Sequence, residues 1–235
     1  MNHPTRRTAL GLVAAALAAP AIGGAQESGG FVLRSIRRDT RRIDYLVRRA
    51  GNARAPMLLG FGGGDAARGI VDYFAESYLP RSTYADHHVI LPIGPPRRLF
   101  FQFTDERARA FLDGLAEREP IEGRSIVVGV SNGGRAAFRF AQAAPERFRA
   151  IAAMPGAMAA PIVPAGWRDY AVVLANGTED GRWQRLTDRT YGILQGRVGA
   201  VTRLPLAGQG HVVAPGFDIE PVYRRLAELE KRLGR

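Results

Sequence analysis

The sequence contains no cysteine in its 235 residues, and it has only four histidines and a single lysine, Lys231. The lack of cysteine excludes disulfide bonds, thiolate metal sites, a cysteine nucleophile and a lipid-modified N-terminal cysteine. The chain is long enough to bury one substantial hydrophobic core and short for two domains. That core must therefore hold the fold together without cross-links.

The positive charge of the chain, a formal net +11, is almost entirely arginine. Between residues 34 and 49, seven arginines are interleaved with apolar residues such as Ile36, Ile43 and Val47. This pattern is typical of paired strands with one face in solvent. A basic surface could also bind a polyanion. Because the arginines are spread along the whole chain, we expect a solvated surface and no nucleic-acid partner.

The first 25 residues predict an export signal. Arg6-Arg7 precedes an apolar stretch over residues 9–19, and small residues follow up to Ala25, which is the usual order of charged, apolar and cleavage segments. The apolar stretch is too short and too rich in alanine for a comfortable membrane span. The paired arginines resemble a twin-arginine signal, with a Sec signal or an uncleaved anchor as alternatives. We expect cleavage near Ala25, a periplasmic or extracellular location, and one domain over residues 26–235 without a stable membrane span.

Short apolar runs alternate with amphipathic segments from about residue 55 to the end of the chain, after a pair of strands over residues 31–36 and 43–47. The further expected strands cover residues 57–61, 88–92, 125–130, 150–154, 171–175 and 200–204. The expected helices cover residues 67–78, 104–118, 132–143, 183–194 and 221–233. This alternation predicts an α/β fold with a mainly parallel sheet, an N-terminal antiparallel hairpin and helices on both faces. Sheets of this kind place their sites at the carboxyl ends of the strands.

The pentapeptide Gly129-Val130-Ser131-Asn132-Gly133 follows an apolar strand and directly precedes an expected helix. A strand that turns sharply into a helix brings its backbone close on both sides of the serine, where only glycine avoids a collision. Such a turn exposes the serine hydroxyl at the positive end of the helix. The pentapeptide is a weak signal by itself. The strand before it and the helix after it make Ser131 the candidate nucleophile.

A serine hydroxyl is a poor nucleophile at neutral pH and needs a base within hydrogen-bonding distance. His3 lies in the expected signal, and His87 and His88 open a strand well before Ser131. His211 lies in a glycine-flanked loop after the last expected strand. Its position fits the chain order of serine, acid and histidine that accompanies this type of turn. We therefore expect His211 to be the base.

The histidine in turn needs a carboxylate that fixes its tautomer and orientation. The expected strand over residues 171–175 is followed by a turn with two carboxylates, Glu179 and Asp180, and both are candidates. Asp169 precedes that strand and therefore lies at its wrong end, and Asp188 falls inside the next expected helix.

The transition state of acyl transfer develops an oxyanion, which needs preorganised hydrogen-bond donors. One expected donor is the backbone N–H of Asn132, the residue after the nucleophile. The other is expected from Gly62 or Gly63, in a run of three glycines that follows the apolar strand over residues 57–61. One interpretation of such a run is a flexible turn without a functional role. Its place directly after the first parallel strand favours the functional interpretation.

From about residue 55 to its C-terminus, the chain resembles the α/β-hydrolase superfamily, and within it the secreted serine esterases related to polyhydroxybutyrate depolymerases and feruloyl esterases. The segments that carry the resemblance are Leu59-Gly60-Phe61-Gly62-Gly63-Gly64-Asp65, Gly129-Val130-Ser131-Asn132-Gly133-Gly134, Asn176-Gly177-Thr178-Glu179-Asp180 and Gly208-Gln209-Gly210-His211. The resemblance implies the α/β-hydrolase fold. It also implies hydrolysis of carboxylic esters through an acyl-enzyme, with a Ser-Asp-His triad and without metal or cofactor.

Two details of the resemblance concern individual residues. The turn that ends at Asp180 is similar to the Gly-Thr-x-Asp turn of many hydrolases, which favours Asp180 over Glu179 as the acid. The relatives commonly have His-Gly where this chain has Phe61-Gly62. That histidine usually supports the oxyanion loop, so this loop is where the chain departs from the family pattern.

Substrate contacts are expected from Phe100, Phe101 and Trp183, which follow strand ends where loops line the cleft. Residues 158–167 are expected to form a short cap, and plain packing of these loops on the core is the alternative. We expect a small-molecule or polymeric ester as the substrate. The alternatives are a peptidase or acyltransferase on the same triad, and a catalytically inactive hydrolase-fold protein that binds polyanions.

Overall fold

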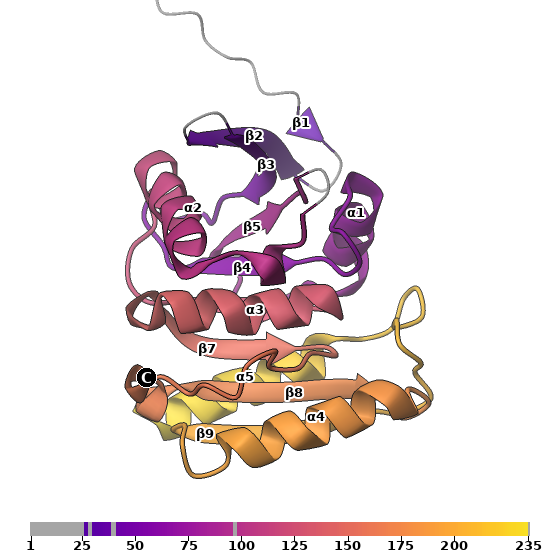
Figure 1. Ribbon diagram of the computed structural model, residues 1–235. Helices are drawn as coiled ribbons and strands as arrows, with labels where there is room; N and C mark the ends of the chain where they lie inside the picture. The colour runs from indigo at the N-terminus through magenta and orange to yellow at the C-terminus, as the bar shows by residue number, and fades with distance from the viewer. Residues whose placement is uncertain (1–25, 28–29, 39–40, 96–97, 235) are drawn as a thin grey trace, which may run out of the picture.

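The computed structural model describes residues 26–27, 30–38, 41–95 and 98–234. The expected signal, with its cleavage position near Ala25, lies outside these residues. The described strands form one nine-stranded sheet in the order β1-β2-β3-β5-β4-β6-β7-β8-β9 (Figure 1). Among the helices that the structure describes, none is long and apolar enough to cross a membrane.

The elements follow the expected alternation closely. The strands are β1 (Gln26–Glu27), β2 (Phe31–Arg38), β3 (Arg41–Arg48), β4 (Met57–Phe61), β5 (His88–Pro92), β6 (Ser125–Gly129), β7 (Phe148–Ala153), β8 (Ala171–Gly177) and β9 (Ala200–Leu206). The helices are α1 (Arg68–Ser77), α2 (Asp105–Arg118), α3 (Asn132–Ala143), α4 (Gly181–Leu194) and α5 (Glu220–Arg232). Short 3₁₀ helices cover Phe100–Gln102, Pro145–Arg147 and Ala165–Asp169, and neither these nor β1 was predicted.

The sheet is mixed, as the sequence predicts. Strands β2 and β3 form an antiparallel hairpin, and β3 pairs antiparallel with β5. Strands β5, β4, β6, β7, β8 and β9 are parallel to one another in that order. In Figure 1, α3 and α4 lie in front of the sheet and α5 lies behind it. Every residue of β4, β5, β6 and β8 is buried because helices cover both faces of these strands.

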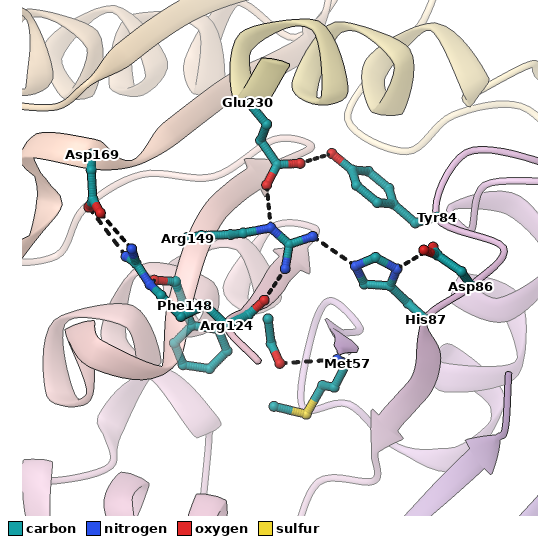
Figure 2. Close-up of polar contacts among 10 residues, drawn as sticks. Met57, Tyr84, Asp86, His87, Arg124, Phe148, Arg149, Asp169 and Glu230 are labelled. Carbon is teal, nitrogen blue, oxygen red and sulfur yellow. Dashed lines mark hydrogen bonds and ion pairs between the residues drawn. The ribbon is translucent and has the colours of Figure 1, made fainter. Parts of the chain in front are cut away.

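A polar network joins three elements at the amino ends of the parallel strands (Figure 2). Arg149 of β7 donates hydrogen bonds to Glu230 of α5 at 2.6 Å and to Nε2 of His87 at 2.9 Å. Tyr84 donates to the same Glu230, and Nδ1 of His87 lies 2.7 Å from the carboxylate of Asp86. Burial lowers the pKa of His87, and the charge of Arg149 acts in the same direction. The network ties α5 and the segment before β5 to β7.

Residues 158–167 do not form the expected cap. The side-chain amide of Gln142, near the end of α3, donates to the carbonyl oxygens of Ala160 at 3.2 Å and Ile162 at 2.7 Å. The fully buried indole of Trp167 donates to the carbonyl oxygen of Ala141 at 3.3 Å. These bonds hold the segment along the half of α3 that is remote from Ser131. It is therefore a packed connection between β7 and β8.

Candidate functional site

Ser131 lies in a tight turn between β6 and α3. Its backbone has φ 59° and ψ −119°, a conformation that residues other than glycine rarely adopt. Its N–H donates to the carbonyl oxygen of Pro155 at 2.7 Å, which fixes the turn against the end of β7. Backbone strain of this kind costs on the order of 1–3 kcal/mol and persists where the surrounding structure enforces it. The turn places the hydroxyl at the carboxyl edge of the sheet, beside the N-terminus of α3.

The two glycines that flank Ser131 are required by close backbone contacts. A Cβ atom at Gly129 would collide with the carbonyl oxygen of Gly133. A Cβ atom at Gly133 would collide with the carbonyl oxygens of Phe61 and Gly62. The structure thus confirms the predicted steric reason for the two glycines. At these positions β6, α3 and the loop after β4 meet.

Three side chains from separate loops form a continuous hydrogen-bonded chain. Nε2 of His211 lies 3.0 Å from Oγ of Ser131, and its Nδ1 lies 2.7 Å from Oδ2 of Asp180. The side chain of Asp180 is 9% exposed and that of His211 is 40% exposed. A proton on Nδ1, facing the carboxylate, leaves the lone pair of Nε2 facing the serine hydroxyl. Among the described residues, no three histidine, aspartate or glutamate side chains are grouped as metal ligands.

The structure places Asp180, and not Glu179, against His211. Glu179 is exposed, and its N–H donates to the carbonyl oxygen of Gln209 at 2.9 Å. Asp180 is also the N-cap of α4, because its Oδ1 accepts a hydrogen bond from the N–H of Trp183 at 3.3 Å. Helix α4 therefore begins two residues earlier than predicted.

The other two carboxylates near this strand lie elsewhere. Asp169 forms an ion pair with Arg124 at 2.5 Å, at the amino end of β8. Asp188 lies inside α4 and pairs with Arg203 of β9. Both carboxylates lie where the sequence predicts, before the strand and inside the helix.

The loop that carries His211 is anchored by two tyrosines. Tyr73 of α1 donates to the carbonyl oxygen of Val213 at 2.6 Å. The hydroxyl of Tyr78 accepts from the N–H of Val213 at 3.0 Å. Burial raises the pKa of Tyr78 to about 12, so its hydroxyl stays protonated at neutral pH. The N–H and the carbonyl oxygen of Val213, two residues after His211, are therefore both held by hydrogen bonds.

The glycine run after β4 lies beside the nucleophile. The side-chain amide of Asn132 donates to the carbonyl oxygen of Gly64 at 3.1 Å. A Cβ atom built on Gly63 would lie 3.5 Å from Cβ of Ser131. The backbone N–H of Asn132, at the start of α3, and those of Gly62 and Gly63 are the groups that this arrangement offers as donors to an oxyanion.

Phe61 supports this loop by packing. Its side chain is fully buried, with its ring centroid 4.7 Å from that of Phe140 and 5.2 Å from that of Phe100. An apolar contact thus occupies the position of the histidine that the resemblance implied. Phe100 is 4% exposed and belongs to this aromatic cluster, which also includes Phe103 and Phe111. Phe100 is therefore a residue of the core and not the exposed substrate contact that the sequence predicts.

Trp183 lies against His211, and both Trp183 and Phe101 contact Arg135, one helical turn after the candidate nucleophile. The rings of Trp183 and His211 are stacked, with centroids 5.4 Å and planes 28° apart. The guanidinium carbon of Arg135 lies 5.0 Å from the centroid of Trp183 and 5.6 Å from that of Phe101. Arg135 was not predicted from the sequence. Its only signal was its position four residues after Ser131, which is one helical turn.

No family model matches the chain, and no curated protein matches its sequence. Solved structures do match. A thermostable esterase aligns with a TM-score of 0.63 and 17% identity over 87% of this chain and 62% of its own. An S-formylglutathione hydrolase from Agrobacterium tumefaciens aligns with a TM-score of 0.62 and 15% identity over 87% of this chain and 95% of its own. A ferulic acid esterase aligns with a TM-score of 0.61 and 15% identity over 86% and 97%.

These similarities are structural, since all three identities are low. The chain spans less than two thirds of the thermostable esterase and nearly all of the other two proteins. The alignments cover 86–87% of this chain, with TM-scores of 0.61–0.63. The chain therefore has the α/β-hydrolase fold.

Proposed function

We propose that this protein is a serine hydrolase that cleaves carboxylic esters. The observation that carries the proposal is the chain from Ser131 through His211 to Asp180, with distances of 3.0 and 2.7 Å. The strained backbone of Ser131 is a second support, because such strain is often found at functional sites. The described esterases and hydrolases of the same fold favour ester substrates.

In the first half of the proposed reaction, Oγ of Ser131 attacks the carbonyl carbon of the ester while Nε2 of His211 takes the hydroxyl proton. The carbonyl π-electrons move onto the oxygen, which the N–H groups of Asn132 and of Gly62 or Gly63 stabilise. Collapse of this tetrahedral species breaks the bond to the alcohol oxygen. The alcohol leaves with the proton from His211, and the acyl group stays on Ser131.

In the second half, water attacks the acyl carbon and gives a proton to Nε2 of His211. The bond to Oγ of Ser131 then breaks, the carboxylic acid leaves, and the proton returns to the serine. Asp180 stabilises the imidazolium of both steps without itself taking the proton. The exposed edge of His211 leaves room for the alcohol to depart and for water to enter.

Two other activities could use the same residues. A peptidase would cleave an amide through the same acyl-enzyme, and an acyltransferase would pass the acyl group to an alcohol in place of water. Parallel assays with acyl esters, aminoacyl amides and added acceptor alcohols separate these reactions. A polyanion-binding protein without activity is disfavoured, because binding alone requires no aligned serine, histidine and carboxylate.

The proposal is tested by hydrolysis of 4-nitrophenyl butyrate by the purified protein and by Ser131→Ala. The wild type should turn over, and the variant should lose on the order of 10³-fold or more in kcat. Equal thermal unfolding curves for the two proteins show that the loss is chemical. Full activity in Ser131→Ala, or salt-sensitive binding to heparin with no hydrolysis of any ester, would overturn the proposal.

We also propose that the protein is exported through the twin-arginine route and cleaved near Ala25. The support is the order of Arg6-Arg7, the apolar stretch and the small residues before Ala25. The mass of the protein recovered from the periplasm or medium tests cleavage. Replacement of Arg6-Arg7 by two lysines should retain the protein in the cytoplasm. Unchanged export of that variant would contradict the twin-arginine route.

A further inference from the structure

Arg135 lies on the same side of α3 as the candidate nucleophile. The N–H of Arg135 donates to the carbonyl oxygen of Ser131 at 3.1 Å, which places the two residues on successive turns. Side chains of a helix lean toward its N-terminus, here the end that carries Ser131. The flanking residues Gly134 and Ala136 are buried, whereas Arg135 is half-buried. Its side chain therefore extends along the surface of α3 toward the site.

Two aromatic rings position the guanidinium. Phe101 belongs to the 3₁₀ helix after β5, and Trp183 belongs to the first turn of α4. Both rings lie within cation–π distance of Arg135, at 5.6 and 5.0 Å. An arginine that stacks on aromatic faces keeps its in-plane N–H groups available for a planar, bidentate partner.

Among the residues that the structure describes, the guanidinium of Arg135 has no carboxylate partner. Arg139, one turn further along α3, forms an ion pair with Asp105 at 2.5 Å. By contrast, no aspartate or glutamate among the described residues pairs with Arg135. Arg182 and Arg185 are exposed beside Trp183 on α4, and Glu179 is the exposed carboxylate of the preceding turn. A half-buried, unpaired arginine next to a site is suited to an anion brought by a ligand.

We propose that Arg135 binds a carboxylate on the substrate, so that the preferred esters carry an anionic group beside the bond that is cleaved. This inference rests on the proposed esterase function. Trp183 links the two positions, because its ring contacts Arg135 and also stacks on His211. The carboxylate accepts two hydrogen bonds from the edge of the guanidinium. Phe101 and Trp183 exclude water from the faces of that guanidinium. Its source is either the acyl or the alcohol part of the ester.

A purely structural role for Arg135 makes a different prediction. If the guanidinium only holds Trp183 against His211, its removal should affect all esters equally, through kcat. If it binds a substrate carboxylate, its removal should affect anionic esters far more than neutral ones, mainly through KM. The ratio of kcat/KM for matched anionic and neutral esters therefore separates the two roles.

Two ester pairs test the two sources of the carboxylate. The acyl pair is 4-nitrophenyl hydrogen glutarate and its neutral isostere 4-nitrophenyl 5-methylhexanoate. The alcohol pair is 3-acetoxybenzoate and 3-isopropylphenyl acetate. The enzymes are the wild type and two variants of Arg135. Arg135→Met keeps an unbranched apolar side chain without the charge, and Arg135→Lys keeps the charge without the planar guanidinium. Arg139→Met is the matched control on the same helix.

We expect the wild type to prefer the anionic ester of at least one pair. Arg135→Met should lower that preference about 10–100-fold, the range for loss of a charge-assisted hydrogen bond. Arg135→Lys should retain part of the preference, Arg139→Met should leave it unchanged, and added salt should weaken it. An equal loss for both members of each pair, or no anionic preference in the wild type, would overturn the inference.

A binding measurement keeps the inference separate from the esterase proposal. Ser131→Ala should bind monomethyl glutarate, seen as a change in tryptophan fluorescence from Trp183, and Ser131→Ala combined with Arg135→Met should not. If the wild type hydrolyses no ester but this Arg135-dependent binding is found, the esterase proposal fails and the anion site stands. If neutral esters are hydrolysed and the binding is absent, the anion site fails and the esterase proposal stands.

Discussion

Oδ2 of Asp180 lies 2.7 Å from Nδ1 of His211, while Oδ1 of the same carboxylate accepts a hydrogen bond from the N–H of Trp183 at 3.3 Å. The carboxylate that orients the histidine is thus itself fixed by the N-terminus of α4. Trp183 completes the arrangement, because its ring stacks on the imidazole. The position of His211 therefore depends on the start of one helix.

Asp180→Asn should lower kcat for ester hydrolysis by ~10²–10⁴-fold, because an amide that donates to Nδ1 favours the wrong tautomer of His211. Asparagine is also a good N-cap, so the thermal stability should change little. Glu179→Gln, on the neighbouring residue of the same turn, is the matched control and should be nearly neutral. A larger loss in Glu179→Gln than in Asp180→Asn would reassign the acid.

Gly133→Ala should destabilise the fold by about 1–3 kcal/mol or prevent folding, because its Cβ would collide with the carbonyl oxygen of Phe61. Gly192→Ala in α4 is the control, since its added Cβ would have nothing within 4 Å beyond the adjoining backbone of its own helix. That substitution should stabilise the protein by roughly 0.5–1 kcal/mol, because alanine favours the helix. Urea unfolding measures both. A free energy of unfolding for Gly133→Ala equal to that of the wild type would show that the turn can relax around a side chain.

Tyr78→Phe should cost about 1–3 kcal/mol of unfolding free energy, because it leaves the buried N–H of Val213 without an acceptor. Tyr73→Phe should cost less, since Tyr73 is only half-buried and water can reach the carbonyl oxygen of Val213 that it leaves. Both variants should also lower kcat by loosening the loop of His211. Unfolding curves and ester hydrolysis measured on the same samples check this order, which a greater loss of stability in Tyr73→Phe would contradict.

Stability should fall as the pH decreases from about 7 to 5. Burial lowers the pKa of His87 below its ordinary value of about 6.5. Between these two pKa values, the unfolded chain binds more protons than the folded protein, so the free energy of unfolding rises with pH. The contribution of His87 is therefore complete above its unfolded pKa and is lost as the pH falls toward its folded pKa.

The effect has a structural cause that a variant can test. Nε2 of His87 accepts from Arg149, so a proton on Nε2 would face the guanidinium. His87→Gln keeps an acceptor but cannot titrate, and it should show a smaller difference in unfolding free energy between pH 7.5 and 5.5 than the wild type. Chemical denaturation at the two pH values measures this. An unchanged difference would show that His87 does not carry the effect.

Much of the fold follows from local sequence. The strands Met57–Phe61 and His88–Pro92 coincide with the predicted ones, because a short apolar run between turn residues is typical of a buried parallel strand. Helix α3 also coincides, because the glycines around Ser131 determine where β6 ends and where the helix begins. Ser131, Asp180 and His211 lie together because all three follow strands that end at the same edge of the sheet.

The features that could not be predicted depend on contacts between distant segments. Phe100 and Phe101 are adjacent in an aromatic run, but the 3₁₀ helix that they form turns Phe100 into the core and leaves Phe101 beside Arg135. No local pattern identifies that turn. Arg135 was one of many arginines in the sequence, and only the positions of Phe101 and Trp183 distinguish it from the others.

The central claim is that Ser131 is the nucleophile of an acyl-transfer reaction. Its most direct test is covalent labelling with diethyl 4-nitrophenyl phosphate, followed by intact mass and peptide mapping. We expect one diethylphosphoryl group per molecule, located on Ser131, with no labelling of Ser131→Ala and slow labelling of His211→Ala. An unlabelled wild type, or a label on a different residue that persists in Ser131→Ala, would contradict it.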